Sequence, residues 1–415
     1  MSRLYNTFEF VGNINIPKNK DKFLEVKDSA SGWSGHRLNF AVQESKTNGV
    51  FVEMYGGYSK AKQNKVYSFG KGTENNKGGK LEIPWEDRLS PETVDLVADF
   101  KKFVIDFTTD QELKEKFEQI RYEIRTLEYK DDPTPEEQDK LHQLKQELAE
   151  KDVDRHEFIH EYDAIVFLAN KLEEYKNYKF KLTGQVDFSE SKGKFYRKFK
   201  PTTIEIVPND TPNQLRSLMD IFFTKDSLDD KDFKKEKKVY VDGYVMCYDG
   251  NAKKDQFFPQ QLMINASKLD FENETHVKRL EFLKNKFKVT GKGVYHLQWV
   301  VNIFRGADTV EFTFNDLTPS QKEAVEFGFN KVEDFAPKGG MLGETLYENR
   351  LVKPVLEKLN DHNDFSGGAV ESSYEVEDLD FVPAQKDNNK PVDTKPETKT
   401  EDKPATSVEL DDLFA

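Results

Sequence analysis

The sequence predicts an α+β fold that is mainly β. Two small β-barrels are expected, with a helical hairpin inserted in the first, then a C-terminal helical segment and a disordered acidic tail. Apolar and polar residues alternate along several runs of strand length. Two nearly identical hexapeptides, Lys179–Gly184 and Lys286–Gly291, each follow a helical pattern and open a β-hairpin pattern. Residues 367–415 contain few apolar side chains, so burial cannot offset the entropy of ordering them.

Length and composition limit the classes of protein to consider. The 415 residues suffice for two or three domains, and aromatic residues make up 13% of them. The single cysteine, Cys247, excludes an intramolecular disulfide and a zinc site built on several thiolates. No run approaches the ~18 apolar residues of a membrane span, and the first residues do not resemble a signal peptide. We expect a soluble, cytoplasmic protein that has no membrane partner.

The first barrel is expected over residues 1–208. Its helical insertion covers about residues 90–175, where Ser90 and Pro91 have the pattern of a helix N-cap and first helical residue. Apolar residues then recur every three or four positions on both sides of a turn at 131–137, which predicts an antiparallel hairpin over 111–152. Strands are expected at 8–16, 37–43, 50–55, from Lys179, 195–199 and 203–207.

The second barrel is expected over residues 213–317, followed by a helical segment at 318–366 and the tail at 367–415. Its strands are predicted at 239–248, 257–266, 299–304 and 309–314, with a helix at 274–283. Both copies therefore have the order strands, helix, strands. Small barrels with a helix between the third and fourth strands have this order, and it is that of the oligonucleotide/oligosaccharide-binding (OB) fold.

Binding of single strands requires cations for the phosphates and flat rings on which bases stack. The segment 194–200 places Tyr196, Lys198 and Lys200 on the strand face that we expect to be exposed. An equally simple interpretation is a solvated lysine edge that prevents aggregation. The predicted nucleic-acid-binding set comprises Trp33, Arg37, Tyr55, Lys60, Lys62, Lys194, Tyr196, Arg197, Lys198, Lys200, Tyr240 and Tyr244.

The other members of this set lie in three places. Trp33 and Arg37 belong to a loop that leads into a strand, and such loops line the groove of an OB fold. Tyr55, Lys60 and Lys62 interleave rings with cations. Tyr240 and Tyr244 lie on the less apolar face of a strand, where they either stack bases or form a second core under a helix.

No motif for catalysis or nucleotide binding is recognised. The sequence contains no glycine-rich loop with the lysine and hydroxyl of a phosphate cradle. His156 and His160, spaced four apart on an expected helix with Glu157 and Glu161, have the spacing of two metal ligands. No third ligand is indicated nearby, so a solvated helix face is favoured. We therefore expect neither enzymatic activity nor a cofactor or metal.

The last seven residues place carboxylates beside an apolar tip. Asp411, Asp412, Leu413 and Phe414 are predicted to dock on protein partners. From Gly368 to Ala415 there are 13 acidic residues and 5 lysines, a net charge of −8 out of −14 for the chain. Such a tail is also expected to compete with DNA for a cationic groove.

This combination resembles the single-stranded DNA-binding proteins of bacteria and phages, which join OB barrels to a disordered acidic tail. Their tails end in an acidic run, an aliphatic residue, a proline and a final phenylalanine. Here no proline precedes Phe414 and Ala415 follows it. The resemblance implies a protein, of phage type by its layout and so in the host cytoplasm, that protects single-stranded DNA. It also implies recruitment of replication, recombination and repair proteins through the tail.

Two other classes of protein fit the same features. A phage structural or assembly protein also uses OB-like modules for docking. A protein inhibitor that imitates DNA with its acidic surface is the other. Neither would respond to single-stranded oligonucleotides.

Overall fold

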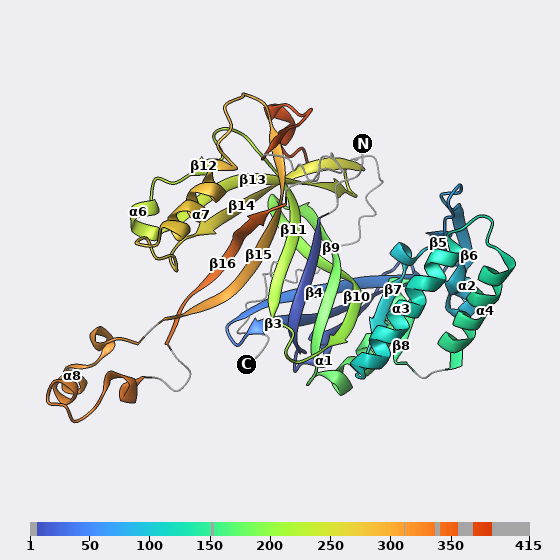
Figure 1. Ribbon diagram of the computed structural model, residues 1–415, viewed down its shortest axis with the longest axis horizontal. Helices are drawn as coiled ribbons and strands as arrows, with labels where there is room; N and C mark the ends of the chain where they lie inside the picture. The colour runs from blue at the N-terminus through green and yellow to red at the C-terminus, as the bar shows by residue number, and fades with distance from the viewer. Residues whose placement is uncertain (1–5, 151–152, 311, 337–340, 356–367, 384–415) are drawn as a thin grey trace, which may run out of the picture.

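The computed structural model describes residues 6–150, 153–310, 312–336, 341–355 and 368–383 (Figure 1). The predicted docking tip, 411–414, and most of the acidic tail lie outside these residues. Within them, fifteen strands join one large mixed sheet, and β5 (Lys65–Phe69) and β6 (Lys80–Pro84) form a separate hairpin. The prediction of a mainly β, α+β protein is confirmed.

Five strands of the N-terminal half follow one another around a closed ring of neighbours, which we call the first circuit. They are β1 (Thr7–Asn15), β3 (Trp33–Ser45), β4 (Asn48–Ser59), β9 (Lys179–Ser191) and β10 (Lys194–Val207). Pairing runs β4-β3-β1-β9-β10. β10 then returns against β4, where Lys198 Nζ lies 2.6 Å from Glu53 Oε1. Alternate side chains such as Phe10, Phe40 and Val52 point inward and are fully buried.

Five later strands form a second circuit, closed entirely by backbone pairing. They are β11 (Gln214–Phe223), β13 (Lys238–Asp249), β14 (Lys254–Asn265), β15 (Tyr295–Val310) and β16 (Met341–Pro354). The pairing order is β11-β13-β14-β16-β15-β11, and β14–β16 is its parallel pair. Helix α7 (Glu274–Asn285) follows β14. Inside, Trp299 stacks on Phe287 at 4.9 Å, and both rings are fully buried.

The two circuits share one hydrophobic core. β1 pairs with β11 from Thr7 to Val11, and Gly306 of β15 pairs with Asn48 of β4. Buried residues of both circuits belong to a single cluster of contacting side chains. The circuits are therefore packed together and are not held by a linker.

The insertion lies between β4 and β9. Its elements are α2 (Pro91–Leu96), β7 (Phe103–Asp106), α3 (Gln111–Glu128), α4 (Pro135–Glu150), β8 (Arg155–Phe158) and α5 (Glu161–Lys171). The α3–α4 hairpin confirms the one predicted at 111–152, and the Ser90 side chain caps α2 as expected. Buried Lys114 anchors α3, because its Nζ lies 2.6 Å from Glu205 Oε2 and donates to Ile206 O at 2.7 Å. Such a buried cation needs both partners to offset its desolvation.

The remaining short helices and strands lie outside the two circuits. They are α1 (Lys20–Phe23), β2 (Leu24–Asp28), β12 (Leu228–Asp229), α6 (Phe233–Glu236), α8 (Pro319–Glu326) and β17 (Val370–Glu371). No helix in the described ranges combines the length and apolar character that crossing a membrane requires. Figure 1 shows the α3–α4 hairpin at one end of the molecule and α8 at the tip of a long β15–β16 arm at the other.

Four expectations differ from the structure. The strands predicted separately at 299–304 and 309–314 are not a pair, because β15 runs from Tyr295 to Val310 as one strand and Phe314–Asp316 is a short helix. The helical segment predicted at 318–366 contains α8, but Met341–Pro354 is a strand, because it pairs with the edge of β15 along most of its length. Lys179–Gly184 lies in β9 as predicted, whereas Lys286–Gly291 lies outside the strands, with Phe287 buried in the core and Val289 packed against it. The tail predicted from residue 367 includes a packed segment, 368–383. Although few of its residues are apolar, its Leu379 is buried in an apolar cluster.

Candidate nucleic-acid interface

Two of the predicted aromatic residues, Trp33 and Tyr55, lie together on the outer face of β3 and β4, and we call them the platform. Trp33 and Tyr55 are 39% and 45% exposed. Trp33 Nε1 donates a hydrogen bond to Tyr55 Oη at 3.2 Å, which fixes the two rings relative to each other. Exposed, immobilised rings of this kind are suitable for stacking bases.

A pair of glycines lies beneath the platform. Gly35 of β3 and Gly57 of β4 are directly opposite each other in the ladder. A Cβ on Gly35 would lie 2.7 Å from Tyr55 Oη, and one on Gly57 would lie 2.8 Å from Trp33 Cζ2. The missing side chains therefore let both rings lie down on the strands.

Three of the cations around the platform are paired with carboxylates. Arg37 Nη1 lies 3.2 Å from Glu25 Oε2, and its guanidinium is 5.7 Å from the Tyr55 ring centre. Lys60 Nζ lies 2.6 Å from Asp28 Oδ2. Lys198 bonds Glu53, as described above. A phosphate would have to compete with these carboxylates. Exposed Lys62 has no ion-pair partner among the described residues.

Glu161, the first residue of α5, lies behind the platform. Its Oε1 accepts a hydrogen bond from the Tyr55 backbone N–H at 3.1 Å. Burial raises the pKa of Glu161 from 4.5 to about 7, against the opposing effects of that hydrogen bond and of Lys200. Its carboxyl group therefore changes charge near neutral pH, next to the backbone of Tyr55.

This raised pKa predicts a pH-dependent stability. Since the folded pKa exceeds the unfolded one, stability is fully present below pH 4.5 and is lost as pH rises through about 7. The contribution is up to about 3 kcal/mol. Urea unfolding of Glu161→Gln at several pH values should show a flatter profile and a gain over the wild type at pH above 7. Replacement of the exposed Glu174 by glutamine is the control, and parallel profiles for Glu161→Gln and the wild type would contradict the prediction.

The predicted residues on β10 differ in their surroundings. Lys194 and Tyr196 are exposed at the start of the strand. Lys200 pairs with Asp187. Arg197 points into the junction between the circuits, where its Nη1 donates to Asn349 Oδ1 at 2.6 Å. Burial, and secondarily Arg305, lower its pKa. Arg197 therefore faces Asn349 and not open solvent, although its functional assignment stays a prediction.

The two predicted tyrosines on β13 are partly covered. Tyr240 Oη donates to Glu236 Oε2 at 2.8 Å, and burial together with this carboxylate raises its pKa to about 12. Tyr244 packs against a small apolar cluster that contains Phe222, Phe257 and Leu379. The expected alternative was a second core under a helix. The structure places this cluster under the segment 368–383.

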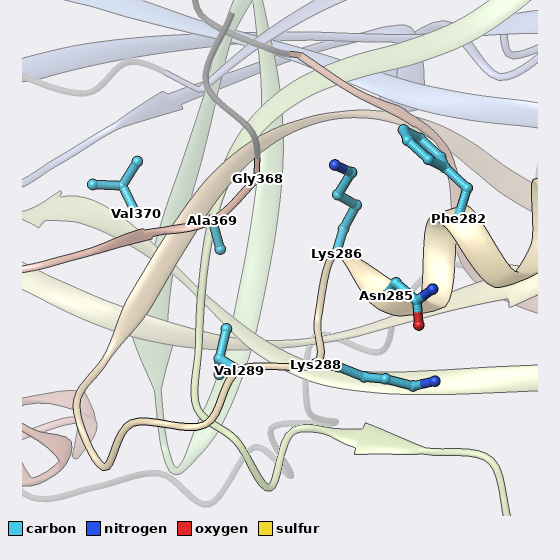
Figure 2. Close-up of a pocket in the computed structure, with 8 residues that line it drawn as sticks. All are labelled: Phe282, Asn285, Lys286, Lys288, Val289, Gly368, Ala369 and Val370. Carbon is cyan, nitrogen blue, oxygen red and sulfur yellow. The ribbon is translucent and has the colours of Figure 1, made fainter.

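That segment, which we term the strap, crosses the second circuit. Its Tyr374 contacts the Phe257 ring at 5.0 Å, and Phe381 contacts Phe258 at 5.1 Å. The strap contains five acidic residues and no lysine or arginine. Figure 2 shows a cavity of about 620 Å³ between its first residues and the end of α7. There Lys286 lies beside Gly368, with its Nζ 4.6 Å from the Phe282 ring centre.

An aromatic cluster that was not predicted from the sequence contacts β3 through His36, on the face opposite the platform. Arg88 stacks on Trp85 at 3.9 Å and makes two hydrogen bonds of 2.9 Å to Asp163. Tyr162 lies 4.9 Å from His36 and 6.0 Å from Trp85. These residues come from separate segments of the insertion and of β3. Arg88 and Asp163 are 75 residues apart, so no local pattern in the sequence indicates their contact.

Comparisons with known proteins give little further information. Neither a protein-family model nor a curated protein sequence matches the chain. Among solved structures, a deletion mutant of the single-stranded DNA binding protein from Thermus aquaticus aligns with 74% of this chain and 89% of its own. The identity is 10% and the TM-score is 0.26. A TM-score this low does not establish a common fold, so functional conclusions depend on the geometry of this chain alone.

Proposed function

We propose that the protein binds single-stranded DNA without chemical turnover, through the outer face of β3 and β4. We infer that each circuit is an OB-type barrel, since each has five strands in Greek-key order and a helix between its third and fourth strands. In such barrels the second and third strands carry the ligand. These strands are β3 and β4 in the first circuit. The Trp33–Tyr55 platform on this face is the observation that supports the proposal most directly.

We extend this proposal to the cellular role and to the protein partners. Single-stranded DNA would be protected during replication, recombination and repair, in a phage-infected cell if the protein is phage-encoded. The tip 411–414 would recruit the enzymes of these processes. A protein-docking module or DNA mimic is the second candidate, favoured by the carboxylate partners of Arg37, Lys60 and Lys198.

A titration distinguishes the two candidates. Oligo-dT should quench the intrinsic tryptophan and tyrosine fluorescence, and added salt should reverse the effect, because stacking and phosphate contacts form together. Duplex DNA and RNA of equal length are titrated in parallel. Unchanged emission and unchanged electrophoretic mobility with oligo-dT at low salt would reject DNA binding in favour of the second candidate.

A further inference from the structure

A basic groove lies where the two circuits meet, and neither Trp33 nor Tyr55 of the platform lines it. It encloses about 330 Å³ beside β11, β15 and β16. Four cationic residues line it: Arg216, Lys268, Arg279 and Arg350. Glu44 is the single acidic residue among those lining it, in a chain whose net charge is −14. We call this surface the junction groove.

The sheet register builds the centre of the junction groove. Arg216 of β11 lies opposite Asn302 of β15, and Asn302 lies opposite Arg350 of β16. Residues directly opposite each other in a ladder project from the same face. A guanidinium, an amide and a second guanidinium therefore form a row across three strands. The amides of Asn213, Gln214 and Asn265 complete the lining.

The groove continues into a neighbouring cavity of about 630 Å³, which shares Gln214 and Arg216 with it. This second cavity adds exposed Lys353 and the hydroxyls of Thr7, Thr183, Thr202 and Ser217. Its acidic residue, Glu9, accepts a hydrogen bond from Gln214 Nε2 at 2.5 Å. Together the two cavities contain five cationic side chains and two carboxylates.

The cations of the groove differ from those at the platform in their partners. Within the described ranges, Arg216, Lys268, Arg279 and Lys353 form no salt bridge, and all four are exposed. Arg350 pairs with Glu348 at 2.7 Å. Arg37, Lys60 and Lys198 all pair with carboxylates. Cations that are clustered and uncompensated repel one another, and an anionic ligand relieves that repulsion.

We propose that the junction groove binds the phosphodiester backbone of a single-stranded nucleic acid, independently of its bases. This inference rests on the proposed function and adds a second contact surface to it. Guanidinium groups bind phosphate oxygens through paired N–H donors, and amides and hydroxyls add further donors. No aromatic residue lines the junction groove itself, and the exposed ring of Phe100 lies only in the neighbouring cavity. The platform then holds bases while the groove holds phosphates.

The test uses the full chain with Arg216→Gln/Arg279→Gln. Lys278→Gln is the matched control, since Lys278 neighbours Arg279 on α7, is 73% exposed and does not line the groove. Binding of oligo-dT and of an abasic phosphodiester oligomer of equal length is measured over a salt series. Because each phosphate contact on a single strand contributes about 0.7 to the slope of log K against log salt, the double variant should lose about 1.4. Lys278→Gln should keep the wild-type slope.

The abasic oligomer separates the groove from the platform. The groove variant should lose most of its affinity for this oligomer, whereas Trp33→Ala should retain it and lose affinity for oligo-dT. Unchanged slopes in the groove variant would overturn the inference, while the effect of Trp33→Ala on oligo-dT would still support the proposed function. A free acidic peptide with the sequence of 401–415 is titrated as well. If the groove variant loses affinity for this peptide but not for the oligomers, the inference is overturned, and the groove is a binding site for the acidic peptide. A wild-type chain that binds neither oligomer would reject both.

Discussion

Replacing Trp33 and Tyr55 together by alanine is expected to weaken binding of oligo-dT by about thirtyfold or more. Each ring that stacks a base contributes ~1–3 kcal/mol, and every ~1.4 kcal/mol changes the affinity tenfold. The two rings are fixed to each other by the Trp33 Nε1 to Tyr55 Oη hydrogen bond, so each single replacement should also release its neighbour. Fluorescence anisotropy of a labelled oligo-dT measures the loss directly.

The matched control is Tyr122→Ala. Tyr122 is 66% exposed on α3, in the inserted hairpin and outside both circuits. Its replacement removes a comparable exposed ring and should leave the affinity unchanged. Thermal unfolding of all variants checks that the fold is intact. If the double variant and the control bind oligo-dT equally well, the platform is not the stacking site.

The sequence predicted well those features that depend on neighbouring residues. The α3–α4 hairpin follows from apolar residues spaced three or four apart, and the start of α2 follows from Ser90 and Pro91. Both result from interactions within a few residues, which a single sequence contains.

Features that depend on distant pairing could not be predicted in the same way. Met341–Pro354 became a strand because β15 offers it an edge, and nothing local marks that partner. The proximity of Trp33 and Tyr55 depends on the β3–β4 register, which sets Gly35 opposite Gly57. The junction groove required three strands in register, and Arg216 and Arg350 are separated by more than a hundred residues. Composition alone gave no indication that those cations would meet.

The carboxylates that pair with the cations of the platform could not be predicted from the sequence either. The sequence predicted that Arg37 and Lys60 bind nucleic acid, but in the structure they pair with Glu25 and Asp28 of β2. Sequence spacing places cations on a face, whereas only the adjacent strand determines whether carboxylates neutralise them.

The strap gives the second large expected effect. A chain that ends after residue 383 should keep the stability of the full chain, because the strap and its contacts remain. A chain that ends after residue 367 should be destabilised by about 2 kcal/mol or more, since Leu379 is 3% exposed and large buried apolar side chains contribute this much. Removal of the strap also uncovers Phe222, Phe257 and Phe258. Urea unfolding followed by the emission of buried Trp299 measures the difference.

A point variant isolates the packing contribution from the change in chain length. Leu379→Ala should reproduce most of the destabilisation, whereas Val376→Ala, three residues away and 45% exposed, should have little effect. The truncation after residue 383 also tests whether the acidic tail competes with DNA for a cationic groove. Cutting after 383 removes 8 acidic residues and 5 lysines without disturbing the second circuit, so a rise in low-salt DNA affinity would then come from the tail alone. Equal unfolding midpoints for the two truncations would mean that the strap does not contribute to the stability of the second circuit.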